Sequence, residues 1–146
     1  MHTLAKRSAF MQIASTPPTL LTYLTTAING EFTAIHFYEE LAKLAPNEET
    51  ERRILEIRQD EMRHFEAFAH AYMSLTGLPP SPEITADMPT SFKAGVRHSF
   101  LDEQETTEFY HRAARESQIA YVSHLFNTAS MDEQNHAVWF LYFLTS

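Results

Sequence analysis

A pattern of acidic residues and histidine occurs twice in this sequence, with the same spacing in both copies. The first copy begins with Glu31 and continues further along the chain with the segment Asp60-Glu61-x-x-His64. The second copy follows at an offset of 72 in residue number and consists of Glu103, Asp132, Glu133 and His136. Because side chains three positions apart lie on one face of an α-helix, each copy presents carboxylate and imidazole groups side by side. These groups are typical metal ligands.

The glutamates and histidines of this pattern fall among apolar residues. Glu31 lies between Ile28 and Ile35 at helical spacing, and the segment from Glu61 to His64 interrupts a similar apolar stripe. Carboxylates grouped in a core repel one another and lose their hydration, and two divalent cations would neutralise four of them. The sequence therefore predicts a buried site for two metal ions. Its predicted ligands are the bridging carboxylates Glu61 and Glu133, the terminal carboxylates Glu31 and Glu103, and the imidazoles His64 and His136.

Proline, asparagine and glycine punctuate the first half of the chain into two long helices. Thr19, directly after two prolines, is expected to cap a helix that runs to about residue 45, where Pro46 stops it. Asn47 is expected to cap a second helix that runs to about residue 76 and ends at Gly77. The connection between the two helices is very short, so they are predicted to form an antiparallel hairpin.

The second half of the chain repeats this organisation after a proline-rich segment, residues 78–90, that is expected to be extended. Ser91 is expected to cap a third helix to about residue 116, and a break near Ser117 and Gln118 leads into a fourth helix to about residue 144. The predicted fold is an all-α four-helix bundle of two antiparallel hairpins joined by a long crossover. Residues 1–18 are expected to be an N-terminal extension, and residues 19–146 the bundle.

The ligand residues are predicted to lie at the same depth in the bundle. Pro46 stands midway between Glu31 and Glu61 in the sequence, so a hairpin that turns at Pro46 places the two glutamates side by side. By the symmetry of the repeat, Glu103 and Glu133 flank the break near Gln118. All six predicted ligands should therefore meet in one layer near the middle of the bundle.

Further residues of the repeat are candidates for supporting this layer. A histidine that binds metal usually donates its other ring N–H to a carboxylate or carbonyl. Asp60 is the predicted partner of His136, and Asp132 that of His64. Arg63 is a candidate for balancing local negative charge. Two tyrosines, Tyr38 and Tyr110, follow the terminal glutamates by two helical turns and are candidates for hydrogen bonds to a ligand.

Composition excludes several classes of function. The chain carries 11 Lys and Arg against 19 Asp and Glu, a net charge of -8, so a broad basic surface for nucleic acid is not expected. It has no cysteine, which excludes disulfides, thiolate zinc sites and iron–sulfur clusters. No apolar run is long enough to span a bilayer. A cytoplasmic location is expected. The apolar run from Val138 to Leu144 predicts a homodimer or a larger homo-oligomer.

The motifs resemble the rubrerythrin and bacterioferritin branch of the ferritin-like superfamily. Asp-Glu-Met-Arg-His at 60–64 is similar to its di-iron signature, and Asp-Glu-Gln-Asn-His at 132–136 to the partner of that signature. Residues 30–38 resemble its first-helix motif, and the resemblance covers about residues 20–144. It implies a ferritin-like fold, two iron ions, and reaction with O₂ or peroxide. The electron donor is not identified.

The chain departs from the family pattern at several points. It lacks the rubredoxin-like domain of full rubrerythrins, and Thr106 stands where some rubrerythrins have a further glutamate. Oxygen and imidazole ligands suit iron and also manganese. The expected function is therefore a di-iron, or manganese and iron, protein with ferroxidase or peroxide- or O₂-reducing activity, in iron handling or in defence against oxidative stress. The alternatives are a di-iron oxygenase that hydroxylates an organic substrate, and a metal-free helical interaction module.

Overall fold

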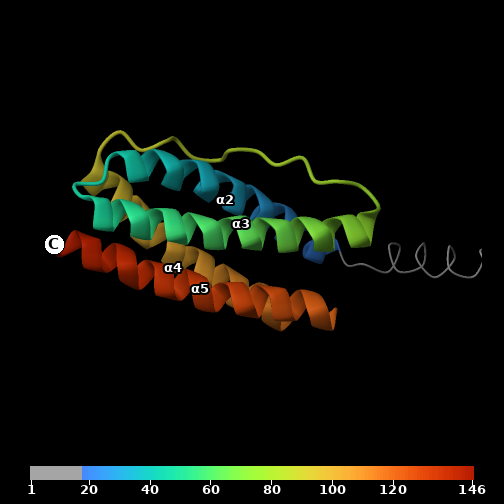
Figure 1. The fold of residues 1–146 in the computed structure, drawn as a ribbon. Helices are drawn as coiled ribbons and strands as arrows, with labels where there is room; N and C mark the ends of the chain where they lie inside the picture. The colour runs from blue at the N-terminus through green and yellow to red at the C-terminus, as the bar shows by residue number, and fades with distance from the viewer. Residues whose placement is uncertain (1–17) are drawn as a thin grey trace, which may run out of the picture.

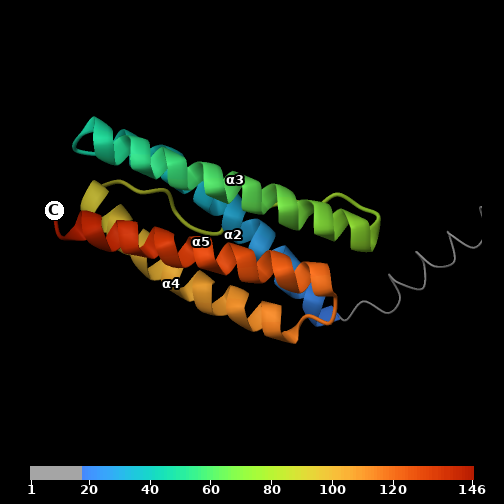
Figure 2. The same cartoon turned by 60° about the horizontal axis from the view of Figure 1, so that its bottom comes forward.

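The computed structural model describes residues 18–146, and within that range the chain forms four α-helices and no strand. The helices are α2 (Pro18–Lys43), α3 (Glu48–Thr76), α4 (Phe92–Glu116) and α5 (Ala120–Leu144). They pack as two antiparallel hairpins, α2 with α3 and α4 with α5 (Figures 1 and 2). The predicted all-α four-helix bundle is confirmed. Apart from Pro18, the expected N-terminal extension lies outside the described residues.

Both ends of α2 differ from the prediction. The helix begins at Pro18, so Thr19 lies within its first turn and is not the cap. Proline is well suited to this position because its fixed φ is helical and its missing N–H would have no helical partner there. The helix ends at Lys43, before the expected end, because a residue that precedes proline disfavours helical geometry and Ala45 precedes Pro46.

The α3 helix has the predicted signals at both ends. The Asn47 side chain accepts a hydrogen bond from the Thr50 backbone N–H, 2.8 Å away. At the other end Gly77 adopts a left-handed conformation, with φ of 74°, and its N–H donates to the Met73 carbonyl. Glycine adopts this conformation without the steric cost that a Cβ would add.

The second hairpin turns where the sequence predicts, although with weaker caps. The α4 helix ends at Glu116 and α5 starts at Ala120, so the break near Ser117 and Gln118 is confirmed. Ser91 occupies the N-cap position of α4, but its side chain makes no capping hydrogen bond. Ser91 therefore stands at the predicted N-cap position, but its side chain does not cap the helix.

The extended crossover runs along the length of the bundle beside α2 (Figure 1). Two contacts attach it to that helix. The Glu83 backbone N–H donates to Asn29 Oδ1 at 3.0 Å, and the Thr85 backbone N–H donates to Thr33 Oγ1 at 2.9 Å. These bonds hold the crossover close to the middle of α2, on either side of Gly30.

The core consists of two apolar clusters with a polar layer between them. One cluster lies towards the start of α2 and includes Leu24, Phe68 and Phe126. The other lies towards the end of α2 and includes Leu41 and Ile54. Across residues 18–146, every helix is too short or too polar to cross a membrane.

Candidate metal centre

The six predicted ligands are all buried in the layer between the two apolar clusters. The four glutamates and His136 are 1–2% exposed, and His64 is 8% exposed. They supply two groups of potential ligand atoms that lie within 4.8 Å of one another. The first group consists of Glu31, Glu61, His64 and Glu133. The second group consists of Glu61, Glu103, Glu133 and His136.

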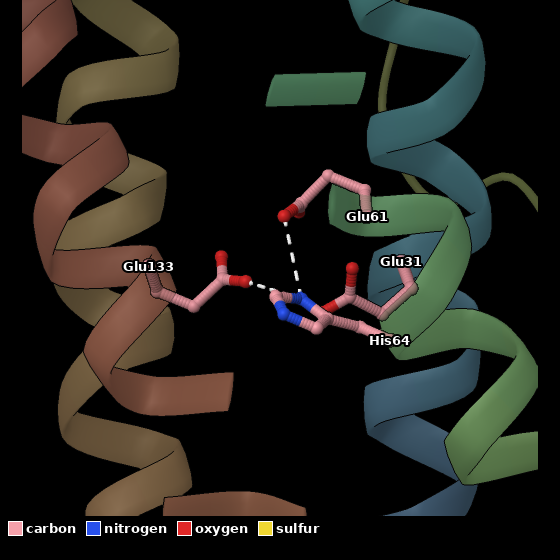
Figure 3. A group of neighbouring side chains, drawn as sticks. All are labelled: Glu31, Glu61, His64 and Glu133. Carbon is pink, nitrogen blue, oxygen red and sulfur yellow. Dashed lines mark ion pairs between the residues drawn. The ribbon is translucent and has the colours of Figure 1, made fainter. Parts of the chain in front are cut away.

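In the first group His64 lies at the centre, with carboxylates from three helices around it (Figure 3). Its Nδ1 is 2.9 Å from Glu133 Oε1 and 3.4 Å from Glu61 Oε1. The Glu31 Oε1 atom is 3.7 Å away. Glu133 reaches His64 from α5 in the opposite hairpin, so the group closes only when the two hairpins pack together.

The second group repeats this arrangement around His136. Its Nδ1 is 3.2 Å from Glu61 Oε1 and 3.6 Å from Glu103 Oε2. Glu61 and Glu133 belong to both groups, whereas Glu31 and Glu103 belong to one group each. This division matches the bridging and terminal positions that the sequence predicts for the four carboxylates.

Each histidine makes the contact expected with an aspartate of the other hairpin. His136 Nε2 is 2.8 Å from Asp60 Oδ2, and His64 Nε2 is 2.8 Å from Asp132 Oδ2. Since an ionised carboxylate can only accept, each ring donates its Nε2 proton, and a neutral ring then directs its Nδ1 lone pair at the carboxylates. Arg63 does not enter the layer, and it donates to Asp60 from the surface.

The two tyrosines also connect the hairpins. The Tyr38 hydroxyl donates to Glu103 Oε1, and the Tyr110 hydroxyl donates to Glu31 Oε1. Burial, followed by the charge of the bonded glutamate, raises the pKa of both hydroxyls well above the ordinary value, so both keep their protons. The tyrosines therefore fix one oxygen of each terminal carboxylate and leave the other oxygen free.

The polar layer contains an unusual set of atoms without partners. Among residues 18–146, six buried side-chain nitrogen and oxygen atoms have no hydrogen-bond partner, and each of the six predicted ligands contributes one. They are Glu31 Oε2, Glu61 Oε1, His64 Nδ1, Glu103 Oε2, Glu133 Oε1 and His136 Nδ1. Buried polar atoms are normally paired because leaving one unpaired costs about 1–3 kcal/mol.

The pKa values of Glu31, Glu61 and Glu133 are strongly shifted by burial and by their neighbours in the layer. Burial raises the pKa of Glu31 and Glu133 well above the usual carboxyl range, and neighbouring carboxylates raise it further. Burial opposes ionisation of Glu61 too, but interactions with His136 and His64 outweigh it and lower its pKa.

Burial alone would lower the pKa of each imidazole. The adjoining carboxylates raise the pKa of His64 to about 11 and that of His136 to about 10.

These features fit two divalent cations. A cation at each histidine would pair with the Nδ1 lone pair and with the free carboxylate oxygens, which are the atoms that have no other partner. Four carboxylates and two M²⁺ ions balance in charge when both imidazoles are neutral. Oxygen and nitrogen ligands without thiolate suit iron or manganese.

Two residues beside the centre were not singled out as functional by the sequence. Gly30 and Asp102 occupy equivalent positions in the internal repeat and directly precede the two terminal glutamates. Both line hollows between α2 and α4. The internal repeat could have pointed to these two residues, because it aligns Gly30 with Asp102, next to the two terminal glutamates.

Comparison with known proteins agrees with this arrangement. The Rubrerythrin family model matches residues 22–93. The uncharacterized protein YhjR of Bacillus subtilis is 48% identical over 127 residues, which cover 87% of this chain and 88% of that protein.

Two solved structures share the fold at lower identity. A thioferritin from Bacteroides fragilis has a TM-score of 0.80 at 18% identity and covers 96% of this chain and 93% of its own. The bacterioferritin BfrA of Mycobacterium tuberculosis has a TM-score of 0.79 at 23% identity and covers 88% and 86% of the two chains. Together with the family match and the relative in Bacillus subtilis, the ligand pattern and four-helix architecture show that the chain belongs to the rubrerythrin family of ferritin-like proteins.

Proposed function

We propose that this protein is a di-iron carboxylate oxidoreductase that oxidises Fe²⁺ or reduces O₂ or peroxide. The observation that carries the proposal is the set of six buried atoms that approach one another but have no hydrogen-bond partner, one on each predicted ligand. Polar atoms stranded this way in a core are tolerated when a cation binds them. Manganese is the alternative metal, because it accepts the same ligands.

The residues have distinct roles in this proposal. Glu61 and Glu133 would hold both cations, because both residues belong to both groups. Glu31 and Glu103 each hold one position, and their tyrosine partners orient them. The aspartates keep the Nε2 proton on each histidine, so that Nδ1 is the ligating atom. Two bound iron ions would supply the electrons that reduce O₂ or peroxide.

The two apolar clusters support this chemistry by excluding water from both ends of the layer. Phe68 and Phe126 close one side, and Phe140 closes the other, all with 0–1% exposure. Exclusion of water strengthens the electrostatic interactions of the ligands with bound cations.

Metal titration and rapid mixing test the proposal. Chelator-treated protein should bind about two Fe²⁺ per chain under anaerobic conditions, and the bound Fe²⁺ should be oxidised by O₂ or peroxide without any organic substrate. Binding of less than about one metal per folded chain would favour the metal-free interaction module. Oxidation that requires an organic substrate would favour an oxygenase.

We also infer that the chain forms a homo-oligomer. The α5 helix exposes five large apolar side chains, Tyr121, Met131, Val138, Leu141 and Tyr142. Exposed apolar patches typically mark interfaces. A dodecameric assembly is described for the Bacteroides fragilis relative. Light scattering should give a mass of at least two chains, and a monomeric mass would contradict the inference. The cytoplasmic location expected from the sequence stays a prediction.

A further inference from the structure

Two hollows lie between α2 and α4, directly beside the candidate metal centre. The larger has a volume of about 440 Å³ and reaches Tyr110, whereas the smaller has a volume of about 220 Å³ and reaches Tyr38. Gly30, Asp102 and the crossover residue Thr85 line both hollows. Because they share three lining residues, the two hollows lie side by side, and they are called here the two lobes of one hollow.

The two lobes are related by the internal repeat of the chain. Residues of one lobe match residues of the other at the offset of 72 that relates the two halves of the sequence. The pairs are Ala27 with Ser99, Phe37 with Phe109, and Tyr38 with Tyr110. Gly30 and Asp102 are partners of each other under the same offset and line both lobes. The pseudo-two-fold axis of the bundle therefore passes between them.

Gly30 leaves the middle of this space open. A Cβ built at Gly30 would meet nothing within 4 Å, and its backbone does not need glycine, because Gly77 alone has a positive φ among residues 18–146. Glycine in the middle of a helix is destabilising relative to alanine. We infer that the gap itself explains the glycine.

Asp102 gives the same place a negative charge. Asp102 lines both lobes, Glu105 lines the larger one, and both are exposed carboxylates. No lysine or arginine lines either lobe, and the one basic side chain on the wall is His98, in the smaller lobe. A cleft lined by charge of one sign concentrates counter-ions and speeds their arrival. The wall therefore favours cations.

Each lobe is lined by a tyrosine that is hydrogen-bonded to one terminal ligand. Gly30 directly precedes Glu31, and Asp102 directly precedes Glu103. Tyr110, which lines one lobe, donates to Glu31, and Tyr38, which lines the other, donates to Glu103. Both glutamates retain a second oxygen without a partner. A cation in either lobe would therefore be separated from a terminal carboxylate by one buried tyrosine that is bonded to that carboxylate.

The space is large enough for a hydrated ion. Six waters occupy about 180 Å³, because each takes about 30 Å³ in the liquid, and the smaller lobe has about 220 Å³. We propose that this two-lobed hollow is the passage by which divalent cations reach the metal centre, with Asp102 attracting them and Gly30 keeping the passage open. The proposal rests on the di-metal centre of the proposed function.

The first test fills the passage and measures the rate of Co²⁺ uptake, which avoids oxidation. Gly30→Leu projects a side chain into the hollow, and Gln104→Leu adds the same side chain on the outer groove between α4 and α5. Both variants should bind as much Co²⁺ at equilibrium as the unmodified protein. In stopped-flow absorbance, Gly30→Leu should load at least about five-fold more slowly, and Gln104→Leu at the unmodified rate.

The second test removes charge and does not depend on the fit of a new side chain. Asp102→Asn and Glu108→Gln each remove one carboxylate from α4, but Glu108 lines the outer groove. Asp102→Asn should slow Co²⁺ uptake about two- to five-fold at low ionic strength, and the difference should shrink as salt is added. Glu108→Gln should leave the rate unchanged.

The possible results distinguish failure of the proposed passage from failure of the proposed di-metal centre. Normal equilibrium binding, with unmodified rates in both Gly30→Leu and Asp102→Asn, would overturn the passage and leave the proposed function intact. Slowing by Glu108→Gln equal to that by Asp102→Asn would show general charge attraction and would also overturn the passage. Failure of the unmodified protein to bind Co²⁺ would overturn the di-metal centre on which the passage depends.

Discussion

The two metal-binding groups share two carboxylates, yet the second lies deeper in the protein than the first. The side chain of His136 is 2% exposed and that of His64 is 9% exposed. The aspartates behind them differ in the same direction, with Asp60 at 28% and Asp132 at 45%. Only the first half of the sequence supplies an arginine beside its aspartate, because Asn135 stands where Arg63 stands in the first copy.

This difference shows where the internal symmetry matters. Ligands and their hydrogen-bond partners repeat in both halves because each cation position needs the same donors. Arg63, which faces solvent, does not repeat, since water screens its charge. We expect the group around His136 to retain its metal more tightly than the group around His64, because its ligand and supporting carboxylate are less hydrated.

The largest expected effect is the loss of bound metal when a glutamate that belongs to both groups is replaced, compared with one that belongs to a single group. Glu61→Gln removes a carboxylate that belongs to both groups, whereas Glu31→Gln affects the first group alone. Glu61→Gln should reduce bound metal from about two ions per chain to nearly none, and Glu31→Gln should leave about one. Metal analysis after dialysis measures both variants. Equal losses in the two variants would refute the bridging role of Glu61.

Lowering the pH should weaken both groups. In the metal-free protein the pKa of His64 is raised to about 11 and that of His136 to about 10, so both rings are protonated at neutral pH. Metal binding must displace these protons, and affinity should therefore fall about ten-fold per pH unit for each proton released. Co²⁺ titrations between pH 6 and pH 8 measure the slope, and a pH-independent affinity would contradict it.

The same pKa values predict opposite behaviour for the metal-free fold. A raised pKa contributes stability below the unfolded value, 6.5 for histidine, and that stability is lost as pH rises towards about 10 and about 11. Metal-free protein should therefore have a lower urea midpoint at pH 9 than at pH 6.5. Metal-loaded protein should not show this loss, because its imidazoles are already neutral.

The sequence predicted the centre of the molecule better than its margins. The ligand layer follows from the repeat and from hairpin geometry, because residues equally distant from a turn must lie side by side. Helix ends were harder to predict, since both Pro18 and Thr19 are suited to the start of a helix. The Ser91 position was predicted correctly, but its hydrogen bond depends on a rotamer.

Some contacts between the hairpins followed from the repeat, as for each aspartate and its histidine, but the tyrosine contacts did not. Which glutamate each tyrosine bonds depends on how one hairpin sits against the other, and no local pattern encodes that. The hollow beside Gly30 has the same origin. Each helix packs chiefly against its own hairpin partner, and the looser seam between α2 and α4 appears only when both hairpins are in place.

The aspartates should affect the two groups unequally. Asp60→Asn and Asp132→Asn each weaken the hydrogen bond that orients a histidine, and such losses typically lower metal affinity about 10- to 100-fold. The larger effect is expected for Asp60→Asn, because Asp60 is less exposed than Asp132. Competition with a chelator measures the affinity. A larger effect for Asp132→Asn would reverse the proposed order of the two groups.

The smallest expected effect is that of Arg63. Its replacement tests whether the burial of the histidine or the arginine beside Asp60 makes the two groups differ in metal affinity. Arg63→Asn removes the arginine of the first copy, and Asn135→Arg supplies one at the matching position after Asp132. Arg63 is 66% exposed, and exposed ion pairs contribute about 0–1 kcal/mol. Each variant should therefore change metal affinity less than about five-fold, with the order of the two groups unchanged in chelator competition. If the double variant Arg63→Asn/Asn135→Arg exchanged that order, the arginine rather than the depth of the histidine would control how tightly each group holds its metal.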